Sequence, residues 1–232
     1  MGKSSTTFWD QFFFIRNFNQ YSVLSSLLQN YEGENLLGYS YIDHEQGITL
    51  EILNLFTEEN KEIVITKNFV ADKSRIIVRF EHFAGIYFEL ADLKKLFSLN
   101  INLPEYIQYY LRSDLKTFRK HEIYQKFSAK GLPDDIAVLL IDETHQYKTE
   151  KVWVRVEYFD AEKEEGKAQL LVQPFQKLKI NKGDEIYFKL VETQNEEIGF
   201  QPVGFYQSSK KSPEESMKIP QEKTSRKWWK FW

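Results

Sequence analysis

Apolar and polar side chains alternate along several short stretches in the first half of the chain. Such a period of two places alternate side chains on opposite faces of a β-strand. Short polar breaks separate the stretches, so we expect neighbouring strands to pair as an antiparallel β meander. The apolar members of these stretches are Ile48, Leu50, Ile52, Ile63, Ile65, Ile76, Val78, Phe80, Ile86, Phe88 and Leu90.

Residues 6–29 follow a helical period instead. Their apolar side chains recur at intervals close to three and four, which predicts an N-terminal helix that residues 30–38 interrupt. Aromatic side chains cover most of the circumference of this predicted helix, so we expect it to be buried on more than one side or to dock on another chain. The apolar positions are Phe8, Phe12, Ile15, Tyr21, Leu24, Leu27 and Leu28.

The middle of the chain returns to helical spacing. Residues 91–99 predict one helix, and a second is expected to begin after Pro104 and to reach as far as Phe127, because proline is well tolerated in a first helical turn. The run Gly131–Asp135 then predicts a turn. We therefore place a domain boundary there, between an N-terminal α+β domain (1–130) and a C-terminal β-rich domain.

The second half of the chain carries mostly strand patterns. A tight-turn signal at residues 181–184 separates two of the predicted strands. We expect residues 131–207 to form a small sheet or barrel-like domain, which makes the whole protein an α+β fold. Residues 208–232 are polar and interrupted by two prolines, which predicts a disordered tail. The predicted strands of the second half span 136–141, 152–159, 168–172, 185–191 and 198–205.

Composition and charge exclude several classes of function. The 232 residues include no cysteine, which excludes a cysteine zinc site, a thiol nucleophile and a disulfide framework. Residues 208–232 hold seven basic and three acidic side chains, so the tail carries +4 and the remainder −7 of the net charge of −3. Nucleic acid is thus an unlikely main partner for the body of the chain. The absence of a secretory signal predicts a cytoplasmic location, with attachment to a membrane surface through the tail as an alternative.

Candidate catalytic chemistry is incomplete. Residues 138–143 have the form of the second nucleotide-binding motif of P-loop ATPases, but the glycine-rich partner loop is missing. We expect Asp134 and Asp135 to be solvated charges in a turn. We assign no catalytic residue, metal ligand or cofactor. An enzyme remains an alternative hypothesis, with a site assembled around Asp142, Glu143 and His145.

The tail carries the most distinctive pattern of the sequence. Four large aromatic side chains and three cations lie within seven residues at its end, a composition suited to docking in a groove of a partner protein. An anionic membrane, single-stranded nucleic acid and the protein's own acidic body are the other surfaces that this composition fits. Our leading hypothesis is a non-enzymatic interaction module, such as an adaptor, an assembly subunit or an immunity-type inhibitor. The predicted partner-binding residues are Arg226, Lys227, Trp228, Trp229, Lys230, Phe231 and Trp232.

Overall fold

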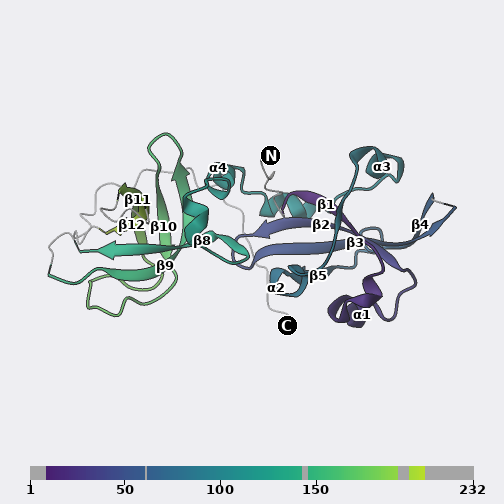
Figure 1. Cartoon of the computed structure of the whole chain (residues 1–232), viewed down its shortest axis with the longest axis horizontal. Helices are drawn as coiled ribbons and strands as arrows, with labels where there is room; N and C mark the ends of the chain where they lie inside the picture. Colours follow the sequence, from purple (N-terminus) through teal and green to yellow (C-terminus); the bar gives the residue numbers. More distant parts are fainter. Residues whose placement is uncertain (1–8, 61, 143–145, 193–198, 207–232) are drawn as a thin grey trace, which may run out of the picture.

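The computed structural model describes residues 9–60, 62–142, 146–192 and 199–206. It is a mixed fold with more strand than helix, in which an open antiparallel sheet and a closed barrel lie end to end along the long axis of the molecule (Figure 1). We call these two parts the N-terminal sheet and the barrel. Among the described residues, no helix has the length and apolar character needed to cross a membrane.

The N-terminal sheet is built around two long central strands. The strand order is β4-β3-β2-β1-β6, and β5 pairs with the half of β3 that β4 leaves free. The predicted meander is therefore present only in part, since β5 and β6 return to earlier strands. The six strands are β1 (Gln11–Ile15), β2 (Asn35–Asp43), β3 (Gly47–Glu59), β4 (Glu62–Asn68), β5 (Ile76–Arg79) and β6 (Glu89–Leu90).

Short helices cover both faces of this sheet. Side chains of the 3-10 helix η1 (Phe18–Gln20), of α1 (Ser22–Leu28) and of α2 (Phe80–Phe83) pack in one apolar cluster with one face of the strands. On the other face pack α3 (Leu93–Ser98) and the 3-10 helix η2 (Glu105–Tyr110). The sheet is thus the middle layer of three.

The predicted N-terminal helix is wrong over its first part. Residues 11–15 form β1, which pairs with β2 and β6, whereas 22–28 are helical as expected. Phe13 packs in the cluster on one side of the sheet and Phe14 in the cluster on the other. A strand buried on both faces is apolar at consecutive positions, and such a run does not show the alternation that identifies an exposed strand.

Strand β2 was missed for the same reason. Residues 30–38 were expected to form a break, but β2 begins at Asn35, and its residues are buried on both faces of the sheet. Gly38, which suggested the break, instead allows close packing, because a Cβ atom there would crowd the side chain of Leu50 and the carbonyl oxygen of Glu51 on β3.

The long second helix predicted after Pro104 is also wrong, while α3 agrees with the helix predicted at 91–99. The chain from 105 to 127 forms short turns because its apolar side chains belong to two different cores. Ile107 packs on the N-terminal sheet, whereas Leu115, Phe118 and Tyr124 pack inside the barrel. A single straight helix cannot reach both cores. These turns are η2, η3 (Ser113–Leu115), α4 (Lys116–Arg119) and η4 (Tyr124–Phe127).

The second half of the chain forms a closed five-stranded barrel, preceded by the two-residue strand β7 (Ser128–Ala129). Consecutive barrel strands are antiparallel, so an odd number of them leaves the first and the last pointing the same way. The barrel accordingly closes through a parallel pairing of β12 with β8. Its strands are β8 (Leu132–Ile141), β9 (Glu150–Asp160), β10 (Glu165–Leu170), β11 (Glu185–Glu192) and β12 (Phe200–Phe205), close to the predicted ranges.

The two halves meet where two glycines approach one another. Gly47 and Gly131 both have left-handed backbone angles, with φ of +79° and +80°, and the Ile48 N–H donates to the Gly131 carbonyl at 2.8 Å. A Cβ atom on Gly47 would overlap that carbonyl. The division into domains at residue 131 stays a prediction. Phe118 and Tyr124, which precede that residue, pack in the barrel core.

Candidate functional site

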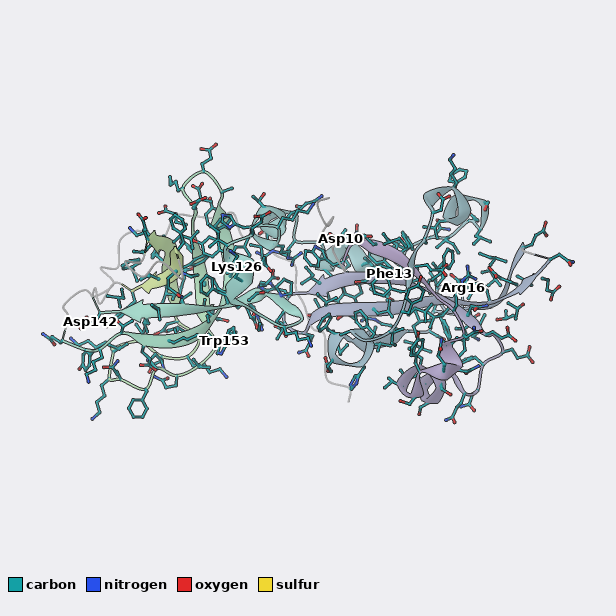
Figure 2. All side chains as sticks on the ribbon, in the orientation of Figure 1. Asp10, Phe13, Arg16, Lys126, Asp142 and Trp153 are labelled. Atoms are coloured by element: carbon teal, nitrogen blue, oxygen red, sulfur yellow. The ribbon has the colours of Figure 1, made fainter. Side chains whose placement is uncertain are left out.

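The structure describes one residue of the predicted enzyme site, Asp142, and its carboxylate is bonded to the backbone. Asp142 follows β8 at the end of the barrel far from the N-terminal sheet (Figure 2). Its carboxylate accepts hydrogen bonds from the backbone N–H groups of Gln146 at 3.0 Å and Tyr147 at 3.3 Å. Glu143, His145 and the predicted docking segment 226–232 lie outside the described residues, so these hypotheses remain predictions.

A buried carboxylate lies at the junction between the two halves. Asp134, at the start of β8, is 2% exposed and accepts two hydrogen bonds of 2.8 Å from the guanidinium of Arg119, which is itself buried. Nδ1 of His44, in the turn between β2 and β3, lies 2.8 Å from the same carboxylate. Burial raises the pKa of Asp134, but the Arg119 and His44 hydrogen bonds and charges lower it more, so it stays ionised.

His44 joins the N-terminal sheet to two barrel strands. Its Nε2 lies 3.0 Å from Glu157 on β9, so both ring nitrogens face a carboxylate and both must carry a proton to donate. Burial lowers the pKa of His44, and its two carboxylate partners raise it by more, so the net pKa lies above the ordinary value. The imidazolium form is therefore the one that links the two halves.

A second ion pair secures the same junction, contrary to the expectation that Asp134 and Asp135 are solvated. Arg155 on β9 donates to Asp135 at 2.7 and 3.0 Å and to the backbone carbonyl of Glu45 at 3.3 Å. Both aspartates are buried. Strand β8 enters the barrel here with two adjacent acids, and each is neutralised by an arginine of a different element.

The stability of the protein should depend on the protonation of His44. The pKa of His44 is raised in the folded state, so its contribution is fully present below about pH 6.5 and is lost as pH rises through the folded pKa. We expect His44→Gln to lower the free energy of unfolding by about 1 kcal/mol at about pH 5.5 and by clearly less at about pH 8.5. Urea denaturation at both pH values measures this difference.

His82 provides the matched control for that experiment, because its side chain is exposed and lies 3.8 Å from the carboxylate of the neighbouring, exposed Glu81. His82→Gln should change stability by the same small amount at both pH values. An effect of His44→Gln that is independent of pH would contradict the role of the imidazolium. Asp134 does not interfere, because its hydrogen bonds to Arg119 and His44 hold its pKa below the ordinary aspartate value, so it stays ionised at both pH values.

A third buried carboxylate fixes residues 105–127, which we call the connecting segment, to the N-terminal sheet. Glu51 on β3 is 1% exposed and accepts hydrogen bonds from the hydroxyls of Tyr41, at 3.1 Å, and of Tyr106 on η2. Arg75 donates to Glu51 at 3.3 Å and to Tyr41 at 2.7 Å, and its guanidinium lies over the Tyr106 ring. Both carboxylate oxygens of Glu51 accept hydrogen bonds, so this acid joins strand β3 to β2 and to η2.

Among the residues that the structure describes, no group of three or more histidine, aspartate or glutamate side chains is placed to hold a metal ion. The family models, curated proteins and solved structures compared with this chain gave no match. Two hollows carry side chains suited to binding, one on the barrel and one at the junction.

The outer surface of the barrel carries exposed aromatic rings next to lysines. Tyr187 on β11 is half exposed, with the Lys167 ammonium 5.1 Å from its ring centre, and Lys189 lies 5.3 Å from the ring centre of Phe205. A groove of about 340 Å³ runs between them, which we call the barrel groove. It is lined by Glu165, Gly166, Tyr187, Phe188, Lys189 and Phe205.

The second hollow is a cleft of about 240 Å³ between the N-terminal sheet and the connecting segment. We call it the junction cleft. Figure 2 shows Asp10 at the end of the N-terminal sheet nearest the barrel, where this cleft lies. Sequence patterns gave no signal for it, because its walls come from three separate stretches of the chain. It is lined by Trp9, Asp10, Tyr39, Leu111, Arg112, Ser113, Lys116 and Arg119.

Proposed function

We propose that this chain is a non-enzymatic protein-interaction module, and that residues 226–232 are its main docking segment. In this proposal the N-terminal sheet and the barrel form a rigid body, and the tail attaches that body to another protein in the cytoplasm. An adaptor, an assembly subunit and an immunity-type inhibitor all act in this way. The composition of the segment carries the proposal, because tryptophan and arginine are enriched among the few residues that contribute most of the binding energy of a protein interface.

The state of the buried acids supports a binding role. Catalytic carboxylates are usually placed in a cavity with an open side for substrate. Glu51, Asp134 and Asp135 are instead each bonded to an arginine, and their contacts join one structural element to another. The described acids that are most deeply buried thus serve to hold the body rigid, as a platform for binding requires.

The exposed aromatic rings of the barrel also favour binding. Phe175 is 95% exposed and Tyr158 and Tyr187 are about half exposed, which is uncommon for large side chains without a partner. Phe205, the last residue of β12, lines the barrel groove, and it is followed by Tyr206, the last residue that the structure describes before the tail. A partner held by the tail would therefore first meet this surface.

Replacement of two tail tryptophans should test the proposal. We expect Trp228→Ala with Trp229→Ala to weaken binding to the partner by at least about 30-fold, because truncation of a tryptophan at the centre of an interface costs about 2 kcal/mol or more. The partner is first isolated from the native cell by affinity purification, and the affinity of the two purified proteins is then measured by calorimetry.

Trp153→Ala is the matched control, because Trp153 is a partly exposed tryptophan on the barrel strand β9. It should leave the affinity within about threefold of the unmodified protein. Unchanged binding by the tail variant would overturn the proposal. Release of the tail variant from anionic phospholipid vesicles, without any effect on a protein partner, would instead identify the tail as a membrane anchor.

A further inference from the structure

The junction cleft presents charges of opposite sign on opposite walls. Asp10 precedes β1 of the N-terminal sheet, whereas Lys116 and Arg119 belong to α4 of the connecting segment. The Asp10 and Lys116 side chains are exposed, and within the described part of the chain neither makes a side-chain hydrogen bond or an ion pair within 4 Å. Arg119 donates hydrogen bonds from Nε and Nη2 to Asp134, so its Nη1 can donate to a further acceptor.

The remaining walls of the cleft are aromatic and apolar. The partly buried Trp9, the buried Tyr39 and the exposed Leu111 all line it. Partial burial and the nearby negative charge of Asp10 raise the pKa of Tyr39 to about 12, so its hydroxyl keeps its proton and can donate. Binding sites for small molecules commonly combine such an apolar lining with a few convergent polar groups, and they often lie between domains.

The electrostatics of the cleft favour a ligand that carries both charges. Although the Asp10 side chain is exposed to solvent on one side, its partial desolvation by the neighbouring walls raises its pKa, and the positive charges of Arg119, Lys116 and Lys120 partly offset that rise. The carboxylate and the cations therefore act on the same space. A ligand with only an anionic group would leave Asp10 without a partner, and one with only a cationic group would leave Lys116 without one. A zwitterion satisfies both walls.

The size of the cleft restricts the ligand further. At about 240 Å³ it is smaller than the sites of about 300–1,000 Å³ that enclose drug-sized molecules. We infer that the junction cleft binds a free α-amino acid with an apolar side chain, whose ammonium meets Asp10, whose carboxylate meets Lys116 and Arg119, and whose side chain packs between Trp9, Tyr39 and Leu111. This inference does not depend on the role of the tail.

Calorimetry with the full chain tests the inference, with L-phenylalanine and L-leucine as probes. We expect saturable binding of both. Two analogues separate the charges: 3-phenylpropionate lacks the ammonium, and 2-phenylethylamine lacks the carboxylate. Each should bind at least about tenfold more weakly than L-phenylalanine, as expected from the loss of one charge-assisted hydrogen bond. N-acetyl-L-phenylalanine should also bind weakly, which distinguishes a free amino acid from the end of a peptide chain.

Two variants assign the charged groups. Asp10→Asn should weaken the binding of L-phenylalanine by at least about tenfold, and it should reduce the ratio of the affinities for L-phenylalanine and 3-phenylpropionate. Lys116→Met should weaken the binding of L-phenylalanine by a similar factor, and it should reduce the ratio of the affinities for L-phenylalanine and 2-phenylethylamine. Both residues are exposed, so the variants should fold normally, which circular dichroism checks. Lys126→Met is the control, since Lys126 is an exposed cation of the same connecting segment that does not line the cleft.

Three results would overturn the inference. The first is the absence of saturable binding of either amino acid. The second is equal affinity for L-phenylalanine and for its singly charged analogues. The third is unchanged affinity in both the Asp10→Asn and the Lys116→Met variants while the Lys126→Met control behaves as the unmodified chain.

Discussion

Arg119→Ala should lower the free energy of unfolding by about 3–5 kcal/mol, the usual cost of leaving a buried charge without its partner. Asp134 is almost completely buried, and Arg119 supplies two of its hydrogen bonds. His44 alone cannot replace them, since it is shared with Glu157. Urea denaturation of the unmodified and the variant protein at the same pH measures the loss.

Three further variants show whether the effect comes from the unpaired charge. Lys120→Ala, at an exposed position next in the chain, should change stability by no more than about 0.5 kcal/mol. Arg119→Lys keeps the charge and loses the bidentate geometry, so it should fall between the two. The double variant Arg119→Ala with Asp134→Ala should be less destabilised than the sum of the single variants. A loss below about 1 kcal/mol for Arg119→Ala would show that the junction does not depend on this pair.

Phe118→Ala should cost about 3–5 kcal/mol, which is typical for removal of a fully buried phenylalanine. Phe118 lies on α4, yet its ring packs in the barrel core, with ring centres 5.5 Å from Tyr124, 5.4 Å from Phe159 and 6.2 Å from Phe188. Its loss leaves a cavity that the rigid strands of a closed barrel cannot fill. Denaturation curves give the change in stability, and near-ultraviolet circular dichroism reports the loss of aromatic packing.

Tyr109→Ala is the matched control for Phe118→Ala, because Tyr109 is an aromatic residue of the same connecting segment whose side chain is 75% exposed. It should change stability by no more than about 0.5 kcal/mol. Similar losses in the two variants would mean that the connecting segment is not part of the barrel core. That result would favour the predicted domain boundary at residue 131.

The fold could be predicted best where strands have one buried face. The barrel strand β9 alternates from Val152 to Val156, with its three valines inside, and β11 alternates from Glu185 to Lys189, so the predicted ranges lie close to those observed. Central strands of the N-terminal sheet have two buried faces and no alternation, so the sequence pattern predicts a helix where β1 lies and a break where β2 begins. A run such as Phe12–Ile15 fits a doubly buried strand and a buried helix equally well until its partners are known.

The sites could be predicted less well, because they are assembled from distant parts of the chain. His44 and Asp134 are ninety residues apart in the sequence. The local sequence predicts that Asp134 is a solvated charge in a turn, because it does not show that Arg119 lies beside this carboxylate. Asp10 and Lys116 both line the junction cleft, but they are too far apart in the sequence for any local pattern to indicate that they lie close together. Local composition does identify the tail segment 226–232, whose role remains to be tested.

The odd number of strands in the barrel has a consequence for anything attached to its end. Because β12 runs parallel to β8, Phe205 lies beside Ile141, and the chain leaves the barrel at the pole opposite the N-terminal sheet. One strand more or fewer would have returned the exit to the junction cleft. A fluorescent reporter or enzyme fused directly after Tyr206 would therefore be separated from that cleft by the whole length of the barrel, and could be added without obstructing it.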